Sequence, residues 1–459
     1  MAKPTVSKPR GWAAGFFPAV FVAAIAPLAA AQPPAEPAAT PALRPLVARA
    51  TQAGLRVFRG RHLMLVTDRP PRDGDGLDQL PPIFDEAFAV WCRHYGLDPA
   101  AHADWQALGC LVVDRDRFRA AGLLPDEVPD FTNGYCWLHR FWLADQSNGD
   151  YRRHLLLHEG VHAFTTTLLK LDTPTWYTEG IAEFLATHRL VATAPRFQQT
   201  PIPAVATEVE QLGRIETIAR LRAAGEAPSL DDVFQLRPTL HGTLTSYASA
   251  WAAVAFLAGH PRYAAVLAAA ERGPLDAEFT ARLTSHPAWD ADTACRDFDA
   301  FTADLDYGYE FERMTIDWSP GEPVDADAPP LRIVVRADRG WQNTGWRLRA
   351  GQQYRLRASG RCVVGTVGEA KKQTVLESEA DGISIDWSRG RPMGRLLVGQ
   401  WDETPDSGGR PQFQILAEGA AATFTAASDG PLFLKINNRP ANLSASDGQL
   451  TVDIVSVDD

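Results

Sequence analysis

The chain has 459 residues, a formal net charge of −11 at pH 7 and a pI near 5.5. This acidic balance argues against nucleic acid as a partner, and the length suits two domains. Five scattered cysteines without CxxC spacing argue against a cysteine zinc site and against a disulfide-dense scaffold. One or two disulfides remain open, and the odd count leaves at least one thiol unpaired.

The N-terminus has the pattern of an export signal. Basic residues precede an apolar run from Trp12 to Leu28, and Ala29–Ala31 offers a small-residue cleavage site. Residues 1–31 are therefore predicted to be a signal peptide cleaved near Ala31, which places the mature protein in the periplasm or outside the cell. The Pro/Ala-rich residues 32–45 are predicted to be a flexible linker. No later stretch is apolar for long enough to cross a bilayer.

The next part of the chain predicts a small sheet with a helix. Apolar runs at His62–Asp68 and Gly109–Asp114 predict strands, and Leu80–Tyr95 predicts a helix between them. The alternating segment Asn133–Asp145 predicts a strand or hairpin immediately before the following helix. An ordinary buried edge strand is the alternative for this last segment.

The segment Tyr151–Leu169 is predicted to form one helix that carries His158-Glu159-Gly160-Val161-His162. Histidines four residues apart lie about 40° apart around a helix, so both rings point into the same space. This geometry suits two ligands of one zinc ion, with Glu159 beside them as a general base. The alternative is an amphipathic helix whose histidines are solvated or in the core. Gly160, a poor helix former, indicates close approach of another chain segment or of a substrate.

A second motif follows at Trp176–Glu183. The stretch Leu171–Pro174 predicts a helix end and a restart, with Asp172 or Thr173 as cap and Pro174 in the first turn of a helix over Thr175–His188. Glu179 can then supply a third zinc ligand. Glu183, one turn further on the same face, is placed to accept the other ring N–H of a zinc-bound histidine. Its alternative is a solvated surface charge.

The two motifs, HEGVHAF and WYTEGIAEFLA, resemble those of the gluzincin metallopeptidases, especially the peptidase-MA-like domains of secreted bacterial proteins. The resemblance covers roughly Leu46 to Tyr309 and implies an α+β domain over residues 46–312, with a small N-terminal sheet and a helical lobe. It implies zinc on His158, His162 and Glu179, with Glu159 as the base. By the same analogy, the segment before the HExxH helix borders the cleft and can pair with an extended substrate. The GxMEN-type aminopeptidase motif is absent, so the resemblance names no substrate.

His154 precedes His158 by four residues and extends the same stripe of histidines. Three consecutive turns span about 12 Å, too far for one ion to engage both ends. We therefore expect His154 to support the ligands from behind or to lie at the cleft edge. A partly buried structural role is the alternative.

Tyr247 is the candidate donor to the oxyanion that forms on an attacked carbonyl. It lies in the segment Ser246–Leu257, which resembles the YxxxWxxVxFL helix that often follows the glutamate motif in peptidase-MA-like domains. The alternative is a tyrosine whose hydroxyl is satisfied elsewhere at the end of a buried helix. His241 and His139 are the next candidates for the oxyanion donor. Helices are predicted to dominate from Thr207 to Asp306, one of them capped by Ser229.

The predicted secondary structure changes from helices to short strands after the Pro-rich, acidic segment Asp317–Pro330. This segment is predicted to belong to a linker over residues 313–330. Four short alternating strands are then predicted, and they indicate an all-β sandwich over residues 331–459. These strands are Leu331–Val335, Gln353–Ala358, Leu432–Ile436 and Leu450–Ile454.

This second region resembles the galactose-binding-like jelly rolls of bacterial lectins, on the strength of Trp341–Gly345, Ala350–Tyr354, Ala358–Gly360 and Gly430–Asn438. The resemblance implies carbohydrate as a partner. In lectins of this type an Asn/Asp cluster can hold calcium and a sugar, but this chain has Asn437-Asn438 in place of the usual Asn-Asp pair, which counts against calcium. The alternative is a sandwich that only packs against or stabilises the peptidase.

The sequence as a whole predicts an exported zinc metallopeptidase that acts on a peptide or protein substrate and carries a β-sandwich accessory domain. One alternative is an extracellular binding protein for glycans or proteins on an inactive peptidase scaffold. The other is a zinc hydrolase of a non-peptide bond.

Overall fold

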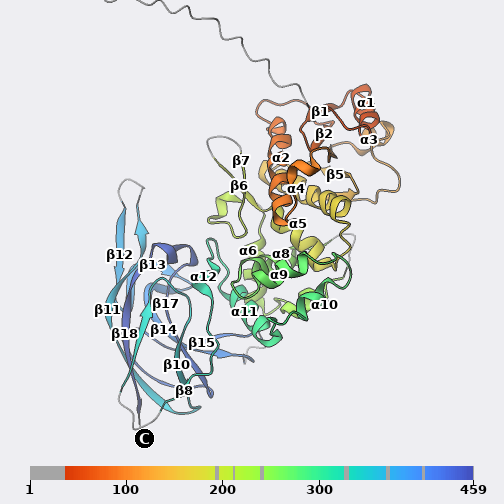
Figure 1. Cartoon of the computed structure of the whole chain (residues 1–459). Helices are drawn as coiled ribbons and strands as arrows, with labels where there is room; N and C mark the ends of the chain where they lie inside the picture. Colours follow the sequence, from red (N-terminus) through yellow and green to blue (C-terminus); the bar gives the residue numbers. More distant parts are fainter. Residues whose placement is uncertain are drawn as a thin grey trace, which may run out of the picture. The chain divides into compact units, whose positions relative to one another are not determined.

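The computed structural model describes residues 37–191, 196–209, 212–237, 242–324, 330–368, 373–405 and 409–457 (Figure 1). The predicted signal peptide, the first part of the predicted linker and His241 lie outside the described residues. The chain from Pro37 to Asp459 forms one compact unit. It contains both helices and sheets, so the α+β class is confirmed. The division of this unit into two domains stays a prediction.

The first sheet has five strands in the order β1-β2-β3-β5-β4. The strands are β1 (Arg56–Arg59), β2 (Leu63–Thr67), β3 (Ala107–Val112), β4 (Gly134–Trp137) and β5 (Arg140–Ala144). β2, β3 and β5 run parallel, whereas β1 and β4 are antiparallel to their neighbours. The segment predicted as a strand or hairpin is a hairpin, and its first strand, β4, forms an edge of the sheet.

Helices cover both faces of this sheet because the side chains of a buried strand alternate between its faces. On β2, Leu63 and Leu65 pack in a core that also contains residues of α2 (Leu80–His94) and α4 (Gly149–Phe164). Met64 and Val66 point the other way, into a core with α1 (Arg44–Gln52) and α3 (Arg115–Ala120). α4, the helix with both motif histidines, is thereby anchored against the sheet.

α4 is shorter than the predicted helix at its C-terminal end. It begins after Asn148, whose Oδ1 accepts a hydrogen bond from the backbone N–H of Tyr151. From Thr165 to Leu169 the chain continues as a π-helical turn, which ends at Lys170 in the left-handed region. Thr165 and Thr167 donate their hydroxyl hydrogens to carbonyls four residues back, a local bond that competes with regular helix geometry.

The next helix begins at the predicted residue, Thr175, but it ends before the predicted residue and lacks the predicted cap. α5 runs over Thr175–Ala186, and Pro174 precedes it at the N-cap position, where no side chain caps the helix. The expected cap by Asp172 or Thr173, and Pro174 in the first turn, are therefore wrong. The helix ends before His188 because Thr187 is extended, and His188–Val191 (β6) pairs with Arg196–Gln199 (β7).

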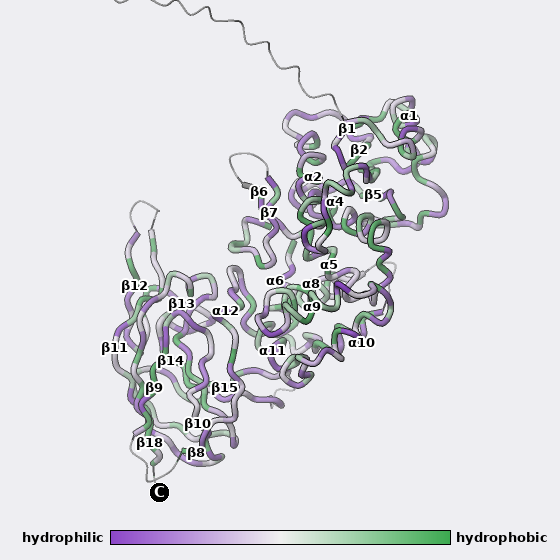
Figure 2. The backbone as a smooth tube through the Cα atoms, in the orientation of Figure 1, coloured by the Kyte–Doolittle hydropathy of each residue, from purple (hydrophilic) through white to green (hydrophobic). Residues whose placement is uncertain are grey.

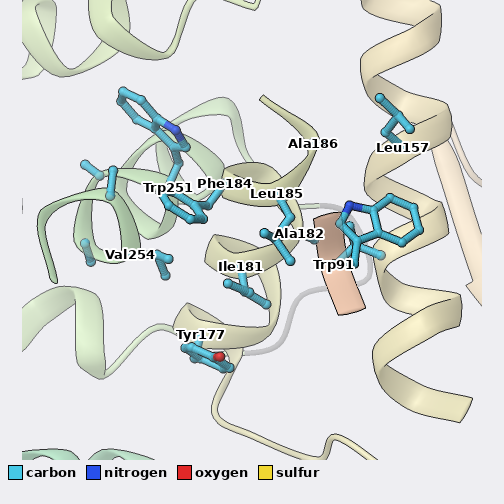
Figure 3. Close-up of a cluster of buried hydrophobic side chains, with 14 of the residues drawn as sticks. Trp91, Leu157, Tyr177, Ile181, Ala182, Phe184, Leu185, Ala186, Trp251 and Val254 are labelled. Carbon is cyan, nitrogen blue, oxygen red and sulfur yellow. The ribbon is translucent and has the colours of Figure 1, made fainter. Parts of the chain in front are cut away.

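α5 lies between α4 and α8 (Leu244–Gly259) and is buried on both sides. Figure 3 shows Ile181, Ala182 and Leu185 in the middle, with Trp91 and Leu157 on one side and Trp251 and Val254 on the other. The contact with α8 requires Gly180, because a Cβ at this position would lie 2.5 Å from the carbonyl oxygen of Ala250. Such packing fixes the position of α5, and with it that of Glu179.

Gly160 of α4 is explained by a second close contact. A Cβ at this position would collide with the ring of Phe84 and lie 3.0 Å from Trp91 Cη2, both on α2. Of the two explanations for this glycine, approach by another chain segment therefore applies.

We expect Gly160→Ala to destabilise the protein by about 1–3 kcal/mol through overpacking. This loss outweighs the gain of about 1 kcal/mol that alanine gives in an exposed helix. The free energy of unfolding from denaturant titration tests this expectation. Gly149→Ala is the control, because a Cβ at Gly149 on the same helix meets nothing within 4 Å. Equal stability of the two variants would contradict the proposed contact.

Further helices complete this part of the chain. They are α6 (Arg214–Ala224), α7 (Leu230–Phe234), α9 (Ala264–Glu271), α10 (Phe279–Thr284), α11 (Ala291–Asp304) and α12 (Phe311–Met314). Ser229 caps α7 as predicted, in a capping box with Asp232. Among the described residues no single helix is long and apolar enough to cross a membrane; only the bent pair α8 and α9 passes, on length and composition alone.

The remaining strands form two sheets around a shared hydrophobic core. One has the order β13-β14-β17-β10-β8, with β15 also on β14, and the other β12-β11-β18-β9, with β16 also on β11. Buried and exposed residues alternate along β9, and the exposed residues are two arginines and Val334. Figure 2 colours these strands by the hydropathy of each residue. The strands are β8 (Glu322–Pro323), β9 (Leu331–Arg336), β10 (Gln342–Leu348), β11 (Gln353–Val367), β12 (Thr374–Ser378), β13 (Asp381–Ser388), β14 (Arg391–Asp402), β15 (Gln412–Glu418), β16 (Ala421–Thr425), β17 (Gly430–Ile436) and β18 (Asp447–Val457).

The four predicted strands of this region lie within β9, β11, β17 and β18. The predicted linker, in contrast, contributes β8, which pairs in parallel with β10. All five cysteines are free thiols in the structure.

Candidate metal centre

His158, His162 and Glu179 direct one donor atom each at a common point. His158 Nε2 and His162 Nε2 are 3.1 Å apart, and Glu179 Oε2 lies 3.5 Å and 3.4 Å from them. The two histidines come from adjacent turns of α4, whereas Glu179 comes from α5. The structure therefore brings together the three residues that the two motifs single out.

The chemistry of this group fits a metal ion. The three donor atoms lie close enough together to hold one ion. Donors about 2.0–2.1 Å from a tetrahedral zinc ion stand roughly 3.3 Å apart, close to the separations seen here. Glu179 Oε2 is buried without a hydrogen-bond partner. A cation at the common point would satisfy this oxygen.

A second group, His154, His158 and Glu183, also has the composition of a metal site. His154 Nε2 is 3.1 Å from Glu183 Oε2, and His158 Nδ1 is 3.2 Å from Glu183 Oε1, at an angle outside that of a hydrogen bond. His158 thus contributes a different ring nitrogen to each group. Glu183 therefore lies on the Nδ1 side of the His158 ring, whereas Glu179 lies on the Nε2 side.

Arg214, at the start of α6, distinguishes the two groups. Its Nη2 and Nε donate to Glu183 Oε1 and Oε2 at 2.8 Å and 2.9 Å, and both residues are buried. The guanidinium already supplies the positive charge that the Glu183 carboxylate needs. The group around Glu179 has no such cation among the described residues, so it is the better candidate for a metal ion.

The sequence analysis did not find Arg214. It contacts Glu183 across 31 positions of the chain, and no local motif marks it. His154 is buried, and its Nε2 contacts Glu183 Oε2. This position fits both the expected supporting role and the structural alternative.

The pKa values of His158 and Glu183 indicate that positive charge is favourable beside these carboxylates. Burial alone would lower the pKa of His158, but the close carboxylates of Glu179 and Glu183 raise it to about 10. Burial would raise the pKa of Glu183, but Arg214 and His154 hold it well below its usual value. A proton or a metal ion at His158 Nε2 would provide the charge that these carboxylates favour.

Glu159 belongs to neither donor group and faces the edge strand β4. A Cβ at Gly134 would collide with its carboxylate, so this glycine leaves the space that Glu159 occupies. Burial raises the pKa of Glu159, and the neighbouring His158 and His162 counteract part of this shift.

One cleft contains the donor group around Glu179 together with Glu159. It has a volume of about 350 Å³, and its lining residues are Gly134, Tyr135, Cys136, Trp137, Leu138, His158, Glu159, His162, Thr166, Thr178, Glu179 and Tyr247. A second cavity of about 270 Å³ shares Thr166, Thr178, Glu179 and Tyr247 with it. This second cavity adds hydroxyl side chains, those of Thr173, Thr175 and Ser246. The donor group therefore lies in a groove that continues past it.

Tyr247 lies at this cleft, on the second turn of α8. Its ring centroid is 5.8 Å from that of His158, and the Arg214 guanidinium lies 5.7 Å from the Tyr247 ring. Burial and the carboxylates of Glu179 and Glu159 raise its pKa, so the hydroxyl keeps its hydrogen. His139 and His241 are the alternatives to Tyr247 as the oxyanion donor. His139 is not among the cleft-lining residues, and His241 lies outside the described residues.

The asparagine pair at the end of β17 is occupied by structural contacts. Asn437 Nδ2 donates to the carbonyls of Ser388, Arg391 and Pro392. Asn438 Nδ2 donates to the carbonyl of Val364 and to Ser446 Oγ. Both residues are buried, and no metal-capable group of His, Cys, Asp and Glu side chains lies among the described residues of these sheets.

No protein-family model matches the sequence, and no curated protein matches it either. Among solved structures, one match is described as "EclA N-terminal domain; PllA-like lectin". It is 19% identical and covers 28% of this chain and 96% of that chain, with a TM-score of 0.19. A likeness at this TM-score supports no conclusion about fold or ligand.

Proposed function

We propose that the chain is a zinc-dependent peptidase of the gluzincin type. The observation that carries the proposal is the convergence of His158 Nε2, His162 Nε2 and Glu179 Oε2, with Glu159 beside them in the same cleft. Two imidazoles and a carboxylate are a frequent ligand set of catalytic zinc, which leaves a position for water or substrate. Zinc, when bound, lowers the pKa of a coordinated water and polarises a carbonyl.

The chain's own residues would then perform the remaining steps. The Glu159 carboxylate accepts a proton from the attacking water and later gives it to the leaving amine nitrogen. Glu183 and Arg214 hold the His158 ring in the orientation that directs Nε2 at the donor group. Tyr247 donates its phenolic hydrogen to the oxyanion on the attacked carbonyl.

A peptide is the favoured substrate because of β4. This strand lines the cleft and, among the described strands, pairs only with β5. Its free edge offers backbone N–H and C=O groups at which an extended peptide can add as a further strand.

A peptide-library digestion by the purified full chain tests the proposal. We expect cleavage that a chelator abolishes and added zinc restores. An inactive binding scaffold predicts bound zinc or peptide without cleavage, and a hydrolase of non-peptide bonds predicts bound zinc with no cleavage of any library peptide. Export, and carbohydrate as a partner of the C-terminal sheets, remain proposals that rest on the sequence alone.

Tyr247→Phe is expected to lower kcat by roughly 10²–10³-fold, the usual effect of removing one oxyanion donor. Zinc content and KM should change little, because the bond strengthens only in the transition state. Tyr307→Phe is the control, since its hydroxyl bonds to Glu216 and does not line the cleft. Full turnover in Tyr247→Phe would remove this residue from the mechanism.

A further inference from the structure

The outer face of the sheet formed by β12, β11, β18 and β9 contains a hollow of about 550 Å³. This volume is within the roughly 300–1,000 Å³ of small-ligand sites. The hollow lies over β11, β18 and β9, which run side by side (Figure 2). We call it the arginine groove, and its lining residues are Pro330, Arg332, Arg355, Arg357, Asp453 and Val455.

The strand register places these side chains in rows across the sheet. Arg357 of β11 lies opposite Asp453 of β18, which in turn lies opposite Arg332 of β9. Arg355 lies opposite Val455 in the next row on this face. Side chains directly opposite each other on neighbouring strands lie on the same face of a sheet. The groove therefore combines three arginines with one aspartate.

Two of the three arginines have no counter-charge. Arg332 Nε and Nη2 donate to Oδ1 and Oδ2 of Asp453 at 2.9 Å and 3.3 Å, so this pair occupies both carboxylate oxygens. Arg355 and Arg357 are exposed, and their side chains have no partner among the described residues. Two uncompensated positive charges therefore remain in the groove, on residues roughly 7 Å apart along β11.

Arg361 shows the contrast on the same strand. It is exposed on the same face of β11 as Arg355 and Arg357, because side chains alternate between the faces of a strand. Its guanidinium pairs with Glu377 and Glu379. The uncompensated charge is therefore confined to Arg355 and Arg357 among the described arginines of β11.

Protection of a sheet edge does not explain these two arginines. Charged residues often block edge strands against unwanted pairing. The segment Gln353–Arg357, however, pairs with β16 on one side and with β18 on the other. Like charges at this spacing repel each other, and a bound anion would relieve the repulsion.

We propose that the arginine groove binds an acidic polysaccharide through carboxylate or sulfate groups on neighbouring sugars. A guanidinium presents a planar fork of N–H donors that matches the oxygens of such anions. Val455 offers an apolar contact between the charged side chains. The inference concerns a different part of the chain from the donor group and does not depend on the proposed peptidase function.

The groove favours a polysaccharide over an acidic peptide or a nucleic acid. β11 and β18 use their backbone groups within the sheet, so an extended peptide would find no free strand edge along the groove. The lining residues include no aromatic side chain, whereas single-stranded nucleic acids are bound largely by stacking of their bases on aromatic rings.

The charges beside the groove also count against an anionic membrane. The carboxylates of Glu377 and Glu379 lie on the same face as the groove, where a flat anionic surface would meet them. A single polysaccharide chain can instead lie across Arg355 and Arg357 alone. The shape of the charged area therefore fits a narrow polyanion.

Binding of the full chain to labelled polysaccharides tests the proposal. Polygalacturonate offers carboxylates, dextran sulfate offers sulfates, and neutral dextran offers neither. We expect the wild type to bind at least one of the two charged polymers, less tightly as the salt concentration rises, and not to bind neutral dextran. The double variant Arg355→Gln/Arg357→Gln should weaken this binding by roughly 10- to 100-fold, about the effect of one charged hydrogen bond.

Arg347→Gln/Arg349→Gln is the matched control. These arginines have the same spacing and charge, are exposed on or next to β10 of the other sheet, and have no side-chain partner among the described residues. The control should bind like the wild type. Both double variants should keep the wild-type unfolding midpoint, because the exchanged side chains are exposed. Equal weakening in the two would show that net charge alone drives binding, which overturns the proposal.

Two further results would also overturn the proposal. One is the absence of binding between the wild type and either charged polysaccharide at low salt. The other is tighter binding to phosphatidylglycerol vesicles or to polyglutamate than to both polysaccharides. That result would assign the groove to a membrane surface or to an acidic peptide.

Discussion

Replacing Glu159 with glutamine is expected to leave zinc on the chain and to lower turnover by about 10²–10⁴-fold, the contribution of general-base catalysis. Glutamine has nearly the same shape as glutamate, so it fits the space that Gly134 leaves against α4. It lacks the carboxylate that accepts the proton of the attacking water. Zinc should remain because Glu159 belongs to neither donor group. Metal analysis gives the zinc content, and kcat on the best library peptide gives the turnover.

Glu216→Gln is the control for this substitution. Glu216 is an exposed residue of α6 that bonds to Tyr307 and does not line the cleft. The control should keep both zinc and turnover. A Glu159→Gln enzyme that hydrolyses peptides at the parental rate would exclude Glu159 as the base, and loss of its zinc would make it a ligand.

His162→Ala is expected to abolish stoichiometric zinc binding. Changes in residues that only support metal ligands cost about 10–100-fold in affinity, so loss of a direct ligand should cost more. The fold should survive because the His162 side chain is partly exposed at the cleft and is not part of the buried network around Glu183. Zinc per chain after dialysis, together with the circular dichroism spectrum, gives both results.

His139→Ala serves as the matched histidine control. His139 lies on the turn between β4 and β5, its Nδ1 contacts the carbonyl of Gln106, and it belongs to neither donor group. Its removal should leave one zinc per chain. Full zinc retention in His162→Ala would contradict the ligand assignment.

The candidate site could be predicted from the sequence as far as helical spacing determines it. The four-residue spacing of His158 and His162 places both rings on one side of a helix, whatever the rest of the fold. Glu179 and Glu183 have the same spacing on α5, and a short connection brings α5 back past α4. The structure adds the distances between the donor atoms of His158, His162 and Glu179.

Contacts that depend on the tertiary fold could not be predicted in this way. Arg214 on α6 contacts Glu183 on α5, so this contact depends on how the two helices are placed in the fold. The left-handed backbone of Leu138 depends on the tight turn between two paired strands, and no glycine or asparagine marks it in the sequence. Arg214 is part of the proposed mechanism because it binds the carboxylate that lies beside His158.

The ends of helices were harder to predict than their middles. The π-helical turn at Thr165–Leu169 follows from threonine hydroxyls that bond back to the helix, which a count of apolar positions does not detect. α5 starts without a side-chain cap because its burial between α4 and α8 stabilises it instead.

The position of zinc in a crystal of the full chain tests the central claim most directly. Anomalous diffraction measured on both sides of the zinc absorption edge locates the ion independently of activity. We expect one peak per chain, bounded by His158 Nε2, His162 Nε2 and Glu179 Oε2. A peak between His154 and Glu183, or no peak in a zinc-soaked crystal of the folded protein, would contradict the assignment.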